Sequence, residues 1–105
     1  MSELSEIQSA LRHFADERNW HRYHTPKNLV MALAGEVGEL LAELQWLTAE
    51  ESTCLRPGDP VHDAVASEMA DVMIYLLRLA DVLDVDLLAS VDAKMDANRN
   101  REWPV

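Results

Sequence analysis

Turn-forming residues are scarce in this chain and occur at only a few places. The 105 residues include 3 Gly and 4 Pro. Apart from Pro26, they lie at Gly35 and Gly38, in the segment 56–60 and near the end of the chain. Because Gly and Pro are the strongest local signals for turns, a chain with so few of them has few turns. We therefore expect long helices.

Apolar residues recur at intervals of three and four along most of the chain, which is the period of an amphipathic helix. The pattern begins with Leu4, Ile7 and Leu11. Thr25 then offers an N-cap side chain, and Pro26 suits the first helical position because its missing N–H costs nothing there. The predicted helices cover residues 2–20, 26–47 or 26–50, 62–83, and 87 to 98 or beyond. Residues 51–60 combine helix breakers with polar residues and are a predicted loop, and Asp84-Val85-Asp86 offers a short turn with another N-cap for the last helix.

No stretch alternates polar and apolar residues for long enough to indicate a β-strand. The pattern therefore predicts an all-α fold in which each subunit is a four-helix bundle with short connections. The length fits one compact domain, residues 1–105. So small a domain has little area with which to enclose a ligand, which favours a site shared between subunits. Leu77 and Ile74, opposite the main apolar face of the third helix, also favour association.

The charge balance limits the possible partners. The chain has 19 acidic and 9 basic side chains, a net charge of -10. Such a surface repels phosphates, so nucleic acid and anionic membranes are excluded as partners. No apolar run reaches the roughly 18 to 20 residues of a membrane span. The N-terminal segment lacks a signal peptide's basic start and apolar run, and Cys54 has no second cysteine to pair with, so we expect a cytoplasmic protein.

Acidic residues form a stripe on each of the two central predicted helices. The stripes consist of Glu36, Glu39 and Glu43 on one helix and of Glu68 and Asp71, with Tyr75, on the other. At about 100° per residue, each stripe borders the apolar face of its helix instead of opposing it. Antiparallel packing would bring the carboxylates together, and unpaired carboxylates repel one another. A cation cage explains them better than a role in stability, and oxygen ligands indicate Mg²⁺ or Mn²⁺.

Other interpretations of the acidic stripes stay open. Carboxylates at the edge of a buried face can reach water or pair with Lys and Arg. In a helical interaction module, an acidic stripe would attract a basic partner and need no metal. A di-iron site is disfavoured because no histidine follows a glutamate by three residues. A zinc site is disfavoured because one cysteine and four scattered histidines lack ligand spacing.

Several segments together resemble a known family. GEVGEL, the later SEMADVMIYLLRLADVLDVDL and the final KMDANRNRE resemble the MazG-like all-α nucleotide pyrophosphohydrolases, and within them the dCTP pyrophosphatase group. FADERNWHRYHTPKNLVMAL is similar to that group's segment before the acidic helix, so the resemblance covers nearly the whole chain. It implies Mg²⁺-dependent hydrolysis of dCTP or a modified dCTP to the monophosphate and pyrophosphate, for nucleotide-pool house-cleaning. Another base, as in dUTP or a purine triphosphate, stays open because no residue spacing decides it.

The resemblance also assigns roles by position. It implies that Glu36, Glu39, Glu68 and Asp71 bind the metal, and we take Glu39 as the general base. The implied substrate-binding residues are Trp20, His24, Trp46 and Tyr75 around the base and Lys94 and Asn98 at the phosphates, with Arg99 beside them. For Trp20 and Trp46, packing in a core or an interface is the alternative. Family members form dimers or tetramers, so the resemblance implies a homo-oligomer.

Overall fold

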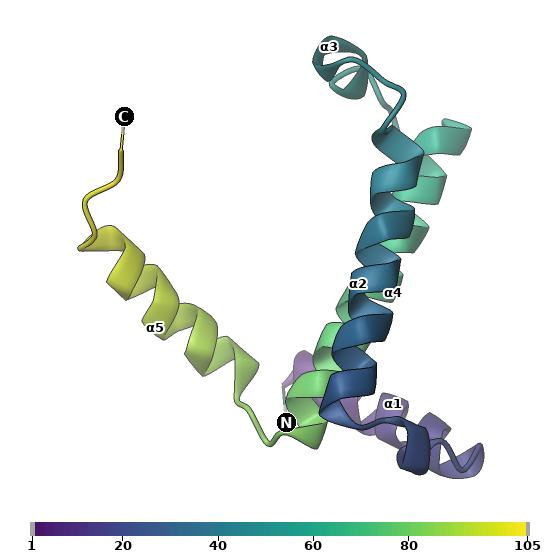
Figure 1. The fold of residues 1–105 in the computed structure, drawn as a ribbon, viewed down its shortest axis with the longest axis vertical. Helices are drawn as coiled ribbons and strands as arrows, with labels where there is room; N and C mark the ends of the chain where they lie inside the picture. Colours follow the sequence, from purple (N-terminus) through teal and green to yellow (C-terminus); the bar gives the residue numbers. More distant parts are fainter. Residues whose placement is uncertain (1, 105) are drawn as a thin grey trace.

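The computed structural model describes residues 2–104, and the regular structure within them is entirely helical (Figure 1). Its elements are α1 (Glu3–Glu17), the 3-10 turn η1 (His21–Tyr23), α2 (Pro26–Leu44), α3 (Ala49–Ser52), α4 (Pro60–Val82) and α5 (Leu87–Arg99). The predicted all-α class is confirmed. No helix in this part of the chain is both long and apolar enough to cross a bilayer.

Side-chain caps set the starts of the helices. The Thr25 hydroxyl accepts a hydrogen bond from the Asn28 N–H at 3.2 Å, and Pro26 follows as the first residue of α2. The Asp86 carboxylate accepts one from the Ala89 N–H at 3.0 Å and begins α5. Such caps satisfy N–H groups that have no partner inside a helix. The predicted starts of both helices are confirmed, and α4 begins two residues earlier than predicted.

Two helix ends differ from the prediction. α1 ends at Glu17 and not near residue 20, because Asn19 adopts a left-handed φ of 56° that a helix cannot contain. α2 ends at Leu44, and the short α3 occupies part of a predicted loop. A capping box causes this: the Glu51 N–H donates to the Thr48 hydroxyl at 3.1 Å, and the Thr48 N–H donates to the Glu51 carboxylate at 2.8 Å.

The helices α2 and α4 run antiparallel, side by side, and α1 crosses the end of this pair where α2 begins (Figure 1). The fully buried apolar residues are few: Ala15, Leu29, Leu77 and Ala80. The prediction that Leu77 faces outward is wrong, since only 2% of it is exposed. α1 covers this face of α4, and its Gln8 side chain donates to the Leu77 carbonyl at 3.3 Å.

The last helix stands apart from the others. After α4, Asp84 takes a left-handed φ of 55°, and α5 then leads away from the α2–α4 pair (Figure 1). The radius of gyration is 16.6 Å, against about 13 Å for a compact chain of this length. Leu88, Val91 and Met95 of α5 remain about half exposed. The predicted four-helix bundle is therefore corrected: within one chain, α1, α2 and α4 pack together and α5 stays outside.

Candidate functional site

Carboxylates from α2 and α4 meet between the two helices. Oxygen atoms of Glu36, Glu39 and Glu68 lie within 4.8 Å of one another. Asp71 lies outside this tight group, yet close enough for its charge to act on Glu36 and Glu68. We call these four residues the carboxylate cluster. Glu43, the third member of the predicted stripe on α2, is not part of it.

Burial and mutual repulsion perturb the protonation of the cluster. Desolvation, the hydrogen bond with Glu39 and the neighbouring negative charges raise the pKa of Glu68 to about 7. Desolvation and then the charge of Glu39 raise the pKa of Glu36 as well. In both residues, Oε2 is buried and has no hydrogen-bond partner within residues 2–104. Buried carboxylate oxygens need a partner, and at neutral pH a proton or a cation can supply it.

The surroundings of the cluster fit a cation. None of the ion pairs among the described residues includes a member of the cluster. The alternative in which these carboxylates pair with Lys or Arg therefore gains no support. The donor set consists of oxygen atoms alone, which is the preference of hard divalent cations such as Mg²⁺ and Mn²⁺. Glu36, Glu39 and Glu68, with Asp71, are the residues that can hold such an ion.

A cavity of about 390 Å³ lies between α1, the segment before α2, and α4. Its walls include Leu11, Phe14, Trp20, His24, Tyr75 and Arg78. The rings of Phe14 and Trp20 meet edge to face, with centroids 5.5 Å apart. Known ligand pockets span roughly 300 to 1,000 Å³. The size and the aromatic walls suit a small flat molecule.

The cavity and the cluster lie along the same side of α4. Glu68, Asp71, Tyr75 and Arg78 follow one another at intervals of three, four and three residues, which places them on one face of the helix. Tyr75 lies about 6 Å and Arg78 about 10 Å along the helix axis from Asp71. One elongated ligand can therefore reach both the cluster and the cavity.

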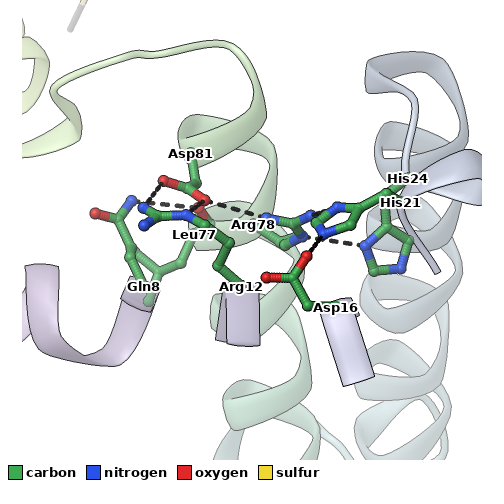
Figure 2. Close-up of polar contacts among 8 residues, drawn as sticks. All are labelled: Gln8, Arg12, Asp16, His21, His24, Leu77, Arg78 and Asp81. Atoms are coloured by element: carbon green, nitrogen blue, oxygen red, sulfur yellow. Dashed lines mark hydrogen bonds and ion pairs between the residues drawn. The ribbon is translucent and has the colours of Figure 1, made fainter. Parts of the chain in front are cut away.

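Arg78 and His24, which line the cavity, belong to a polar network (Figure 2). Arg78 is 5% exposed, and its guanidinium donates to His24, His21 and Asp81. Arg12 of α1 donates two further hydrogen bonds to the Asp81 carboxylate, at 2.9 and 2.6 Å. The Arg12 hydrogen bond, more than any other contact, lowers the pKa of Asp81. The network joins α1, η1 and α4 behind the cavity.

The structure brings three of the four predicted base-pocket residues together. Trp20, His24 and Tyr75 line the same cavity, and the Trp20 and His24 rings lie with their centroids 6.0 Å apart. Trp46 lies beyond the end of α2 and is 86% exposed, so in a single chain it belongs neither to this cavity nor to a core. Arg78 was missed by the sequence analysis. Its spacing from Asp71, seven residues along one helix face, was the available signal.

The predicted phosphate contacts lie on α5, away from the cluster. Lys94, Asn98 and Arg99 are carried by a helix that leads away from the α2–α4 pair (Figure 1). Arg99 pairs with Asp96 of its own helix at 2.7 Å. Within residues 2–104, the side chains of Lys94 and Asn98 form no hydrogen bond or ion pair with the cluster. A single chain therefore does not bring these residues to the carboxylates.

Comparison with known proteins finds relatives that are named as hydrolases of deoxynucleoside triphosphates. The chain is 42% identical over 102 residues to dCTP pyrophosphatase 1 of Bos taurus, covering 97% of this chain and 60% of that protein. It is 31% identical over 100 residues to a dATP/dGTP diphosphohydrolase of Cyanophage S-2L, covering 95% of this chain and 77% of that protein. No family model matches the chain.

A solved structure supports the same relationship. A pyrophosphatase from Archaeoglobus fulgidus superposes with a TM-score of 0.82 at 38% sequence identity, covering 93% of this chain and 90% of that one. The two chains are therefore similar in both fold and sequence over most of their length. The chain spans about 60% of the length of the bovine relative that it matches.

Proposed function

Since the chain belongs to the MazG-like family of nucleotide pyrophosphohydrolases, which includes the dCTP pyrophosphatases, we propose that it hydrolyses a deoxynucleoside triphosphate to the monophosphate and pyrophosphate. The proposed substrate is dCTP or a modified dCTP, and the proposed role is nucleotide-pool house-cleaning. The observation that carries this function is the carboxylate cluster, with atoms within 4.8 Å, on the same side of α4 as an aromatic cavity. The names of the relatives support the reaction class.

The cluster is the proposed metal site. Glu36, Glu39, Glu68 and Asp71 would hold Mg²⁺, with Mn²⁺ as a substitute, and the unpartnered Oε2 atoms of Glu36 and Glu68 fit this role. When bound there, the ion would offset phosphate charge and orient the attacking water. The raised pKa values of Glu36 and Glu68 fit the same role. Repulsion between the carboxylates favours their protonated forms, and a bound cation would replace those protons.

Glu39 is the proposed general base. It is the exposed glutamate of the tight group, and it lies in contact with both Glu36 and Glu68. Its carboxylate would accept a proton from the water that attacks the α-phosphorus, while the α–β bridging oxygen leaves with pyrophosphate.

The cavity is the proposed base pocket. Its distance from the cluster along α4, about 6 to 10 Å, suits a nucleotide whose phosphates lie at the carboxylates and whose base lies at the far end of the sugar. The rings of Trp20 and Tyr75 offer flat surfaces for a base, and His24 offers a polar edge. Trp46 is the proposed additional stacking residue, and its 86% exposure leaves its ring open to a ligand or a neighbouring chain.

We further propose that the active protein is a homo-oligomer, a dimer or a dimer of dimers. The chain exposes 8002 Å², whereas a folded monomer of its mass exposes about 5,900 Å². The excess of about 2,000 Å² per chain is in the range that obligate dimers bury. Met31 and Leu41 of α2 and Met69 of α4 are each more than half exposed. In such an assembly, a neighbouring α5 would supply Lys94, Asn98 and Arg99 to the phosphates.

Pyrophosphate release from a panel of deoxynucleoside and ribonucleoside triphosphates, with Mg²⁺ and with a chelator, tests the proposal. We expect metal-dependent release that is greatest with dCTP or a modified dCTP. Greatest release with dUTP or a purine triphosphate would keep the reaction and correct the base. No release from any nucleotide would overturn the enzymatic proposal and favour an acidic helical interaction module.

A further inference from the structure

Arg78 makes contacts that the proposed reaction does not use. We propose that Arg78 is a positioning residue that fixes the hydrogen-bonding polarity of the base pocket: it holds His24 in the tautomer whose proton is on Nε2, so that His24 offers the base a donor and never an acceptor. This inference rests on the proposed function, because it names the kind of base edge that the same cavity accepts.

The three hydrogen bonds of Arg78 carry the first step. Its Nε–H donates to His24 Nδ1 at 3.1 Å, and Nη2 donates to His21 Nδ1 at 2.9 Å. On a third side, Nη1 donates to the Asp81 carboxylate at 3.1 Å. A guanidinium has donors only and keeps its charge in proteins. Each ring nitrogen that faces Arg78 must therefore be an unprotonated acceptor.

The second step follows from the chemistry of imidazole. A neutral imidazole has one donor and one acceptor nitrogen, so an acceptor at Nδ1 places the proton on Nε2. In His21, Nε2 is paired with the Asp16 carboxylate. In His24, Nε2 has no hydrogen-bond partner within the part of the chain that the structure describes, and the residue lines the cavity. The Nε2–H of His24 is thus a donor free for a ligand.

The surroundings keep His24 neutral. Burial, the charge of Arg78 and the neighbouring His21 lower its pKa. The titratable and charged groups around it are Arg78, Asp81 and Tyr75 of α4, His21 of η1, and Asp16 and Arg12 of α1. The two nearby carboxylates are already engaged, Asp81 by two arginines and Asp16 by His21. The donor at Nε2 therefore persists through the neutral pH range.

A fixed donor selects among bases. A base that offers a carbonyl oxygen or an unprotonated ring nitrogen to His24 gains a hydrogen bond. A base with an amino group or a protonated ring nitrogen at that point places two donors against each other and leaves both unsatisfied. Without Arg78, the imidazole can change tautomer or gain a proton, and this selection weakens.

Nitrogen NMR of the full chain with labelled histidine tests the tautomer directly, and loss of a signal in His24→Gln assigns it. In the wild type we expect Nδ1 unprotonated and Nε2 protonated at pH 7 to 8. In Arg78→Met we expect a tautomer mixture and a higher pKa for His24. A protonated Nδ1 in the wild type, or an unchanged tautomer in Arg78→Met, would overturn the proposal. Arg12→Met, which removes the other arginine on Asp81, should leave the His24 signals unchanged.

Steady-state kinetics give the second readout. Arg78→Met should raise KM for the preferred nucleotide about tenfold, which corresponds to one hydrogen bond of about 1.4 kcal/mol. The kcat should stay near the wild-type value, because the cluster lies about two helical turns away. A loss of kcat of about tenfold with unchanged KM would overturn the positioning role. If Arg78→Met does not fold, Arg78→Lys takes its place: the tautomer mixture and the rise in KM are expected as before, because one ammonium cannot hold His24, His21 and Asp81 together, whereas the pKa of His24 should stay low because the positive charge remains. If the chain hydrolyses no nucleotide, the proposed function fails while the NMR result still decides the tautomer.

Discussion

Metal binding at the carboxylate cluster should displace a proton from Glu68. Desolvation, the contact with Glu39 and the nearby negative charges raise the pKa of Glu68 to about 7, and a carboxylate binds a cation in its deprotonated form. A group with this pKa is about 90% protonated at pH 6 and about 10% protonated at pH 8. The apparent affinity for Mg²⁺ should therefore rise about tenfold between these pH values. The raised pKa of Glu36 increases the dependence of metal affinity on pH in the same direction.

Isothermal titration calorimetry of the metal-free protein with Mg²⁺, repeated with Mn²⁺, measures this effect. Titrations in two buffers of different ionisation enthalpy give the number of protons released for each bound metal. We expect about 0.9 proton at pH 6 and about 0.1 at pH 8 from Glu68 alone, as proton linkage requires. The dissociation constant should follow the same curve.

Two variants separate Glu68 from the general acidity of the chain. Glu68→Gln removes the titrating group, so it should bind the metal more weakly and lose most of the dependence on pH. Glu43→Gln removes a glutamate of the same α2 stripe that lies outside the cluster, and it should behave as the wild type. Equal affinity at pH 6 and pH 8 in the wild type, or full pH dependence in Glu68→Gln, would refute the reasoning.

Three further predictions concern stability, catalysis and base binding. Because the pKa of Glu68 is raised on folding, its contribution to stability is fully present below about pH 4.5 and is lost as the pH rises through about 7. The urea midpoint of the metal-free wild type, relative to that of Glu68→Gln, should be lower at pH 8 than at pH 5; this comparison cancels the opposite contribution of His24, whose pKa is lowered on folding, and a relative midpoint that does not fall would contradict the prediction. Glu39→Gln and Asp71→Asn should abolish metal-dependent pyrophosphate release while circular dichroism shows the helices intact, and retained activity in both would remove them from the site. Trp46→Ala should weaken nucleotide binding by about 1 to 3 kcal/mol if the ring stacks on the base, whereas unchanged affinity in a binding titration would exclude stacking.

Local signals predicted most of the helical framework. Thr25 with Pro26 marked the start of α2, and Asp86 marked the start of α5. These signals work because a cap acts on N–H groups within three residues of itself. The same kind of signal, Thr48 with Glu51, was present at the start of α3. The prediction placed the end of the preceding helix and the start of a loop there, and it missed α3.

The side of each helix on which the acidic residues lie was also set by local geometry. Glu36 and Glu39 share one side of α2, and Glu68 and Asp71 share one side of α4, because helical geometry sets the angle between neighbouring residues. Antiparallel packing then brought three of the four into one group. The spacing left open which of them are buried and what their pKa values are. Those depend on atoms of the opposite helix.

The place of α1 and the burial of Arg78 required the tertiary structure. α4 carries apolar residues on nearly every side, so its sequence did not tell which side α1 covers. The structure shows that α1 packs over Leu77, and that Arg78 lies buried beside it with His24, His21 and Asp81 as partners. A buried arginine is tolerated only where acceptors surround it. Here those acceptors come from segments more than fifty residues apart.

The sequence by itself determined that this chain is helical, where most helices start, and which carboxylates can act together. These properties arise from backbone geometry and hydrogen bonds that link residues three or four positions apart. Only the tertiary structure decided that α5 stays outside the core, that the cavity forms between α1 and α4, and that Arg78 lies buried in one of its walls. These properties depend on which apolar faces are buried against each other, and several faces of this chain could have filled that role.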